Sequence, residues 1–271
     1  LADYSKKLKG LDLKIYSENY IFGDNNSNLF VSDLRINLKN ENFLLLRYKL
    51  ASASPNYNYL LYTSNYESYN WNNQFDNTLS NSLAFQFKLK KILDLDVNLI
   101  SVRKHIQFEK KLFESADGEL GNIIMPVQSN GELDLLKINL KRKINFGKFS
   151  IDSRLMFQKS ISDNIINIPE IISRNTIYFS TDMFQKSLFL QTGFGIKYFS
   201  KYYMNGYDPL LSELYLQNDK KIGEFPLIDF FINAKIQQTR LYFKFEHLNS
   251  SLTGFNFYSA PNYPFRDFTF R

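Results

Sequence analysis

The sequence predicts an all-β protein: an antiparallel up-and-down transmembrane β-barrel, or the large C-terminal part of one, with roughly 12 strands in this segment. Three observations lead to this prediction. Apolar and polar residues alternate along most of the chain, as they do in strands with two unlike faces. Short and long connections alternate between these stretches. Most stretches reach about ten residues, the length that a tilted strand needs to cross a bilayer.

The alternation is clearest between Ser187 and Tyr202. One face carries Leu188, Leu190, Phe194, Ile196, Tyr198 and Tyr202, and the other carries Gln191, Gly193, Gly195, Lys197 and Lys201. The same period of two appears in 148–158, 228–237 and 239–246, and helical spacing fits none of these stretches. Further strands are predicted near 7–20, 29–38, 43–52, 80–90, 92–108, 131–144, 172–182 and 266–271.

The stretch 92–108 changes phase. Its apolar residues occupy odd positions up to Leu99 and even positions from Ile100 onward. An extra residue inserted into one strand shifts the alternation in this way. We therefore predict one long strand with a β-bulge near Leu99 and Ile100.

The connections are of two kinds. Tight turns are predicted at 39–41, 90–91, 145–147, 183–186 and 238–239, and longer polar segments at 22–28, 53–79, 109–130, 162–171, 203–226 and 249–265. Bacterial barrels have short periplasmic turns and long extracellular loops, whereas a Greek-key sandwich does not sort its connections in this manner. The pattern favours a membrane barrel over a soluble β-rich domain such as a carbohydrate-binding sandwich.

Composition agrees with this prediction and narrows the function. Aromatic residues make up 17% of the chain, and several lie near strand ends, where interfacial girdles occur. No segment approaches the roughly 18 consecutive apolar residues of a transmembrane helix. Cysteine is absent, which excludes disulfides and thiol chemistry. The net charge of +6 is spread along the sequence without a basic block, so we expect no nucleic-acid partner.

Charged and polar side chains on one face of the strands are the candidates for lining a pore. An unpaired Lys or Arg that faces lipid near the bilayer midplane costs roughly 2–4 kcal/mol, so these side chains must face water or one another. Rings of charge in a pore set its ion preference. The alternative is a plugged barrel whose charges pair across the interior. The predicted lumen-lining residues are Lys88, Lys90, Asp152, Arg154, Gln191, Lys197, Lys201, Asp229, Lys235, Arg240, Lys244 and Glu246.

Nothing in the sequence has the arrangement of a catalytic site. Only two histidines occur, His105 and His247, and they are too far apart in sequence to suggest a metal site. Glu246 and His247 would point to opposite faces of an extended strand, so they cannot act as a directly paired base. We expect His247 on the face of Phe243 and Phe245, near a membrane rim. The sequence predicts no enzyme, no cofactor and no metal.

Four short motifs in the last third of the chain carry a resemblance. They are Gln191-Thr192-Gly193 with Lys197-Tyr198, the segment 223–229 (GEFPLID), the segment 245–249 (FEHLN) and the segment 258–264 (YSAPNYP). In these motifs the chain resembles the putative porin family of the Bacteroidota outer membrane. The resemblance implies an outer-membrane location and a barrel architecture. Members of that family are longer and finish with a strand ending in an aromatic residue. We therefore expect residues 1–271 to be one barrel domain that continues beyond Arg271, and we leave the N-terminal side open.

Two functions from different classes follow. The first is a porin-like channel in the outer membrane of a Gram-negative bacterium, through which small hydrophilic solutes diffuse passively. The second is a non-conducting barrel that acts as a scaffold or accessory subunit of an outer-membrane complex. Both place the chain in contact with outer-membrane lipid, and the second adds protein partners. The Tyr-rich segment between Tyr57 and Trp71 could bind sugar, fold inward as a constriction, or simply pack against neighbouring loops.

Overall fold

The computed structural model describes residues 2–22, 25–66, 68–90, 92–114, 117–118, 120–162, 166–253 and 258–271. Its main element is one 13-stranded antiparallel sheet, in which each strand pairs with the next sheet strand along the chain. In order, the strands are β1 (Ala2–Leu8), β2 (Leu11–Phe22), β3 (Asn25–Asn37), β4 (Phe43–Ala53), β7 (Thr78–Leu89), β8 (Leu93–Arg103), β11 (Glu132–Phe146), β12 (Phe149–Ser160), β13 (Ile171–Met183), β14 (Leu188–Phe199), β19 (Leu227–Ile236), β20 (Thr239–Glu246) and β23 (Thr269–Phe270).

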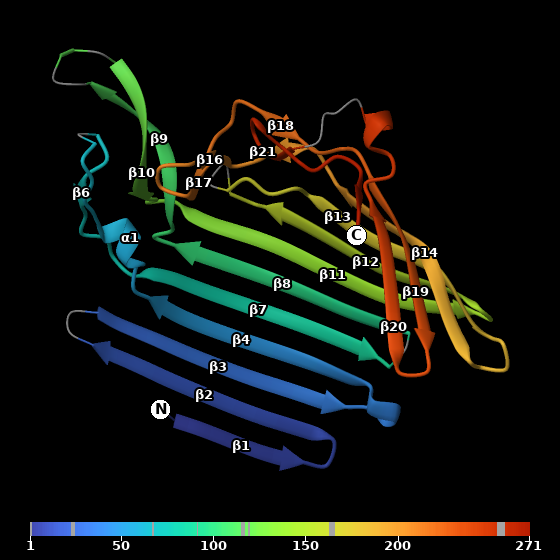
Figure 1. Cartoon of the computed structure of the whole chain (residues 1–271). Helices are drawn as coiled ribbons and strands as arrows, with labels where there is room; N and C mark the ends of the chain where they lie inside the picture. Colours follow the sequence, from blue (N-terminus) through green and yellow to red (C-terminus); the bar gives the residue numbers. More distant parts are fainter. Residues whose placement is uncertain are drawn as a thin grey trace.

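The predicted all-β, up-and-down topology is therefore confirmed. The sheet coils, so that β14, β19 and β20 turn out of the plane formed by β1 to β8 (Figure 1). This coiling follows from the twist that strand sterics impose on every large sheet. β1 and β23 are the two edges of the described sheet, so the closure of a barrel stays a prediction.

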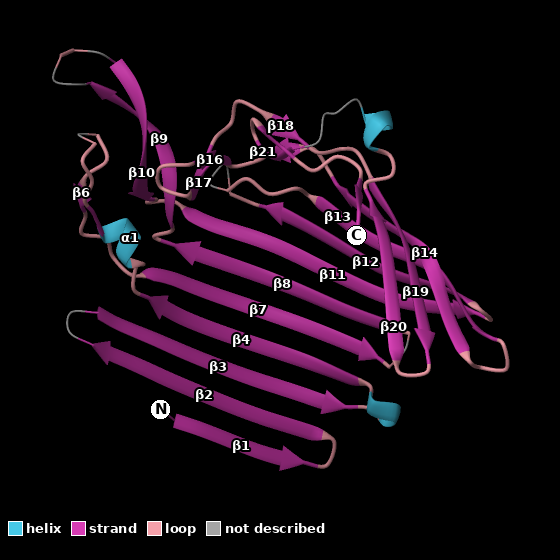
Figure 2. Ribbon diagram, in the orientation of Figure 1, coloured by secondary structure: helices cyan, strands magenta, loops and turns pink. Residues whose placement is uncertain are grey.

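The remaining strands are short and lie in the long connections. A second sheet has the order β10-β9-β17-β16 and consists of β9 (Ile106–Glu114), β10 (Leu120–Gln128), β16 (Gly206–Asp208) and β17 (Glu213–Leu216). Three two-stranded pairs are β5 (Leu61–Tyr62) with β6 (Trp71–Asn72), β15 (Tyr202–Tyr203) with β18 (Lys221–Ile222), and β21 (Tyr258–Ala260) with β22 (Tyr263–Pro264). Strands account for almost all regular structure (Figure 2).

Helical structure in the described part of the chain is confined to short segments of three or four residues. The described residues contain α1 (Tyr57–Leu60) and the 3-10 helices η1 (Lys39–Glu41) and η2 (Ser250–Thr253). None of these helices has the length and apolarity that a membrane-crossing helix requires.

The predicted start of the first strand, 7–20, is wrong. The structure has a hairpin there, in which Leu8 pairs with Leu11 across a two-residue turn. Gly10 adopts φ 83°, a backbone conformation that glycine takes without the steric cost of a side chain. The short β1 strand before this turn was missed because its apolar residues do not alternate strictly.

The predicted bulge near Leu99 and Ile100 is also wrong. β7 and β8 pair without a shift from Leu79 opposite Arg103 to Leu89 opposite Leu93. The chain leaves the main sheet after Arg103, and β9 belongs to the second sheet. The phase change has another cause: apolar residues also occupy the inner side of the sheet near this end. Val102 lies opposite Leu133, which is buried.

The alternation of short turns and long loops holds with one exception. The predicted long connection 22–28 is short, because β2 runs to Phe22 and β3 begins at Asn25, with these two residues paired. Residues 23 and 24 within it lie outside the described residues. The short turns after β1, β3, β7, β11, β13 and β19 lie at one end of the sheet, the turn end; the connections after β2, β4, β8, β12, β14 and β20 lie at the other, the loop end.

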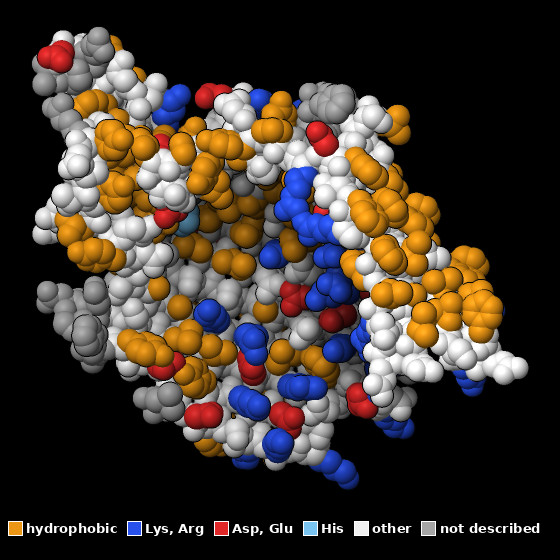
Figure 3. Space-filling view, viewed as in Figure 1, with side chains coloured by type: hydrophobic (Ala, Val, Ile, Leu, Met, Phe, Trp, Pro, Cys, Tyr) orange, Lys and Arg blue, Asp and Glu red, His pale blue; other side chains and the backbone are white. Residues whose placement is uncertain are grey.

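The two faces of the sheet differ in chemistry. Residues paired directly across antiparallel strands point to the same face, so each run of paired residues forms a row across the sheet. One such row consists of Leu13, Leu34, Leu46, Phe85, Val97, Ile138 and Phe157. One residue nearer the turn end, the side chains point to the other face. The row there contains Asp12, Arg35, Leu45, Gln86, Asp96, Asn139 and Met156. Charged side chains gather on the concave face (Figure 3), so by strand register the apolar row lies on the opposite, convex face.

The apolar convex face is not covered by another layer of the described chain. Leu46 and Phe85 are 42% and 40% exposed, and Phe194 and Phe243 farther round the sheet are 47% and 43% exposed. In a soluble sandwich such side chains would be buried beneath a second sheet. Most of the buried hydrophobic residues that the structure describes instead lie in the long connections, and Trp71, Phe108 and Ile124 form a cluster there.

Candidate functional site

The candidate site is the concave face, and its main feature is a row of basic side chains. The pairing of six successive strands, from β7 to β14, places these residues side by side. We call this set the basic row, and it consists of Lys88, Asp94, Lys141, Arg154, Arg174 and Lys197. Five of its six side chains are cationic. The row begins next to the turn end at Lys88 and finishes near the loop end at Lys197.

A buried carboxylate anchors the loop end of the basic row. Asp229 is 5% exposed, and its Oδ2 accepts Lys197 Nζ at 3.0 Å and lies 3.1 Å from Lys244 Nζ. Its Oδ1 accepts the backbone N–H of His247 at 3.1 Å. Lys244 also donates to Glu246 Oε1 at 2.6 Å. Each carboxylate oxygen therefore has a partner, which a buried charge requires.

The structure places most of the predicted lumen-lining residues on this concave face. The residues that share it by strand register are Lys88, Asp152, Arg154, Gln191, Lys197, Asp229, Lys235, Arg240, Lys244 and Glu246. Alternation identified them correctly as one face. Their role in a lumen stays a prediction. Sequence reasoning passed over Lys141 and Arg174, which lie between Lys88 and Lys197 in the basic row; only strand register could have revealed them.

Two predicted residues do not lie on the wall of the sheet. Lys90 belongs to the turn after β7 and pairs with Glu41 of η1 at 2.6 Å. Lys201 follows the end of β14 and lies 3.6 Å from Glu224, with both side chains more than half exposed. Both lysines lie beyond the last residue of their strands, at the ends of the sheet. Strand alternation does not apply there, and it therefore placed these two side chains wrongly.

The prediction for His247 is wrong. β20 ends at Glu246, and His247 adopts φ 57°, so its side chain leaves the alternation of the strand. Of the described side chains it is the most deeply buried, at 1% exposure, and its Nδ1 lies 2.9 Å from the carbonyl oxygen of Arg266. Its ring packs near Phe265. His247 therefore joins the end of β20 to the final segment of the chain instead of facing a membrane rim.

A hollow of about 290 Å³ lies on the concave face between Arg174, Lys197 and Lys244. Gly193 and Gly195 alternate with apolar convex residues on the strand beneath it, β14. At Gly193 an added Cβ would stand 2.6 Å from Tyr178 Cβ and would also meet the carbonyl oxygen of Ile177. At Gly195 the nearest atom is Asp229 Cβ at 3.9 Å. The close approach of Tyr178 to β14 therefore requires a glycine at position 193, whereas position 195 has room for a side chain.

We expect Gly193→Ala to lower the free energy of unfolding by about 1–3 kcal/mol, because the new methyl group forces β13 and β14 apart. Gly195→Ala is the matched control on the same strand and face, and it should change stability by less than about 0.5 kcal/mol. Urea unfolding of the protein in lipid vesicles measures both. Equal effects of the two substitutions would contradict the packing described.

The long connections form a loop cap with its own small core. We use this name for the packed residues Trp71, Phe108, Ile124, Tyr59, Tyr62, Tyr69, Leu211 and Tyr215. Tyr62 stacks on Trp71 with ring centroids 4.8 Å apart, and Tyr69 donates from its hydroxyl to Asp208 Oδ2 at 3.1 Å. Burial raises the pKa of Tyr69, and the Asp208 carboxylate raises it further, so this hydroxyl keeps its proton. Of the three interpretations of the Tyr-rich segment, packing against neighbouring loops fits these contacts.

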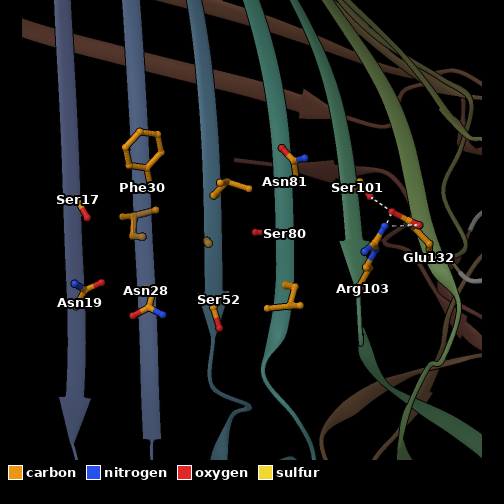
Figure 4. A pocket seen from close by; sticks show the side chains of 14 residues that line it. Ser17, Asn19, Asn28, Phe30, Ser52, Ser80, Asn81, Ser101, Arg103 and Glu132 are labelled. Atoms are coloured by element: carbon orange, nitrogen blue, oxygen red, sulfur yellow. Dashed lines mark hydrogen bonds and ion pairs between the residues drawn. The ribbon is translucent and has the colours of Figure 1, made fainter.

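A hollow of about 570 Å³ lies mostly on the convex side at the loop end, and Figure 4 shows its lining. Asn19, Asn28, Ser52, Leu79, Arg103 and Glu132 form one row across it by strand register. Arg103 donates to both carboxylate oxygens of Glu132, at 3.1 and 3.2 Å. This mostly polar row marks where the apolar convex surface stops, as expected at the level of lipid head groups.

No group of three or more acidic or histidine side chains that could hold a metal ion occurs within the ranges that the structure describes. Glu132 and Asp134, a carboxylate pair in sequence, lie on the convex side, opposite Arg103 and Ser101. Asp94 and Asp96 lie on the concave face, where Asp96 accepts a hydrogen bond from Asn139 at 3.2 Å.

Comparisons with known proteins agree with this architecture. The ferric enterobactin receptor (PfeA) from Pseudomonas aeruginosa, in its R480A mutant form with enterobactin bound, superposes with a TM-score of 0.57 at 12% identity, over 89% of this chain and 38% of its own. The siderophore receptor PirA from Acinetobacter baumannii superposes with a TM-score of 0.53 at 12% identity, over 96% of this chain and 44% of its own. At such identity the likeness shows the fold alone. The chain spans about two fifths of the length of these receptors. No curated protein matches it.

A coiled antiparallel sheet with an apolar convex face and a charged concave face defines the class of outer-membrane β-barrel proteins. The whole sequence, residues 1–271, matches the family described as "Putative porin". The chain belongs to that porin family.

Proposed function

We propose that this protein is a pore of the Gram-negative outer membrane, through which small hydrophilic solutes diffuse passively. The observation that carries the proposal is the distribution of charge between the two faces of the sheet. Lys141, Arg154 and Arg174 occupy the concave face with their side chains exposed. The apolar row that contains Leu46, Phe85 and Val97 lies on the convex face. Such a wall separates lipid on one side from water on the other.

Family membership supports a pore, and the likeness to the two receptors supports a wall of this curvature. The concave charges would have to be hydrated, because only some of them pair with carboxylates. A barrel filled by its own protein would pair or bury them more completely. Three hollows of the concave face have charged side chains in their lining, including Arg154, Arg174 and Arg47 respectively.

The full-length protein in a planar lipid bilayer tests this function. We expect discrete current steps that persist without any added partner, together with size-limited uptake of sugars into vesicles that carry the protein. A preparation that is folded, as judged by heat-modifiable gel mobility, and yet neither conducts nor admits sugars would contradict a pore.

The second candidate function is a non-conducting scaffold in an outer-membrane complex. The loop end favours it, because the β9–β10 hairpin exposes Leu112 and Leu120 at 79% and 75%. Exposed apolar side chains on a water-facing hairpin suit a protein partner. Absence of conductance, combined with loss of a co-purifying outer-membrane protein after Leu112→Ser and Leu120→Ser, would support this function instead.

A further inference from the structure

The basic row has an electrostatic property that pore formation by itself does not require. Lys141 lies directly opposite Arg154, Arg154 opposite Arg174, and Arg174 opposite Lys197. Like charges directly opposite one another on paired strands destabilise a sheet, since their Cβ atoms are only about 4.5–5.5 Å apart. Three such pairs in succession indicate that something negative occupies this strip when the protein works.

Asp94 lies directly opposite Lys141, but the middle of the row has no close ion pair among the described residues. Lys197 is paired with Asp229, but Arg154 approaches Asp152 only at 3.8 Å, with both side chains well exposed. Among the described residues, no carboxylate oxygen comes within 4.0 Å of Lys141 or Arg174. The positive charge of these side chains is therefore available to solutes.

The row also runs between two hollows of the concave face. One, of about 210 Å³, is lined by Lys88, Lys141, Lys143 and Arg154 together with the carboxylates Asp94 and Asp152. The other is the 290 Å³ hollow at Arg174 and Lys197. Each hollow is large enough for a small hydrated anion and has a guanidinium group in its lining. A guanidinium presents two parallel N–H donors, which match the oxygens of a phosphate or carboxylate group.

We propose that the basic row is a binding track for small oxyanions, phosphate and carboxylate compounds, with Lys141, Arg154 and Arg174 as its central contacts. This inference rests on the proposed pore function and names the class of solute that the pore favours. An oxyanion between two opposed cations removes their repulsion. The row extends from near the turn end to near the loop end, so it offers several weak sites in sequence. Multiple weak sites let an ion enter and also leave.

The test compares three forms of the full-length protein in planar bilayers. They are the wild type, the triple variant Lys141→Gln, Arg154→Gln and Arg174→Gln, and a matched control Lys148→Gln, Lys159→Gln and Lys186→Gln. The control removes the same charge from two turns and the convex face. The readouts are the reversal potential in a potassium chloride gradient and the decrease of chloride current on adding inorganic phosphate.

We expect the wild type and the control to prefer anions over potassium and to lose chloride current when phosphate is added. The triple variant should conduct, should shift its reversal potential toward potassium and should be insensitive to phosphate. Cation preference in the wild type, or unchanged selectivity and phosphate sensitivity in the triple variant, would overturn the track while leaving the pore intact.

A second measurement separates the two proposals if no form conducts. Phosphate should raise the thermal unfolding temperature of the wild type above that in potassium chloride of equal ionic strength, and this difference should vanish in the triple variant. That outcome would retain the binding track after the pore had failed. The same unfolding temperature in phosphate and chloride for the wild type would overturn the track. Removal of the opposed cations should not impair folding, because it relieves repulsion.

Discussion

Asp229→Ala is expected to lower the free energy of unfolding by about 2–4 kcal/mol. The carboxylate is buried and serves three donors, namely Lys197 Nζ, Lys244 Nζ and the backbone N–H of His247. Its removal leaves two cations facing each other and one buried N–H group without this acceptor. The loss falls below that of a fully buried ion pair because the Lys197 side chain is 41% exposed and can be hydrated in part.

Asp152→Ala is the matched control for this prediction. Asp152 also faces the concave side, but its side chain is 40% exposed and lies 3.8 Å from Arg154, so its removal should change stability by less than about 0.5 kcal/mol. Urea unfolding in vesicles gives both values. Asp229→Asn should fall between the wild type and the alanine variant, because the amide oxygen still accepts a hydrogen bond. If the two alanine variants were equally stable, Asp229 would not anchor β14, β19 and β20.

Phe85→Arg is expected to destabilise the protein in lipid by roughly 2–4 kcal/mol, the cost of an arginine facing the bilayer interior. Phe85 is 40% exposed in the apolar row of the convex face, between Leu46 and Val97. No described residue nearby offers it a carboxylate partner on that face. Membrane insertion and urea unfolding in vesicles measure the effect, and Phe85→Ala gives the part that arises from lost packing.

The adjacent residue provides the control. Gln86 lies on the concave face, opposite Asp96, and its side chain donates to Asp94. Gln86→Arg places the same charge one residue away, beside two carboxylates and in water, and it should cost less than about 1 kcal/mol. Similar losses for Phe85→Arg and Gln86→Arg would show that lipid does not cover the convex face.

The sequence predicted the parts of this protein that depend on local periodicity. A strand exposes alternate residues to opposite sides, so Leu188 and Lys197 could be assigned to opposite faces without any knowledge of their neighbours. The same reasoning identified Asp229 and Lys244 as members of one charged face. The lengths of the connections gave the up-and-down order, because a hairpin with a short turn leaves little choice of partner.

Periodicity failed where the chain left the main sheet. The phase change after Leu99 looked like a bulge, whereas the structure shows an unbroken β8 whose inner side becomes apolar near the loop end. His247 was assigned to the wrong surroundings for the same reason, since alternation ends when a residue adopts a left-handed backbone conformation. At His247 the positive φ ends the extended backbone of β20, so the alternation of that strand does not predict the direction of this side chain.

The sequence by itself determined the class of fold, the two-faced strands and the assignment of Lys197, Asp229 and Lys244 to the charged face. Only the tertiary structure decided which residues of that face lie together. Strand register brings Lys141, Arg154 and Arg174, from three separate strands, into one row, and coiling of the sheet gathers Lys197 and Lys244 around Asp229. Register depends on pairing between strands far apart in sequence, and a one-residue slip would change every partner, so no local pattern could specify it.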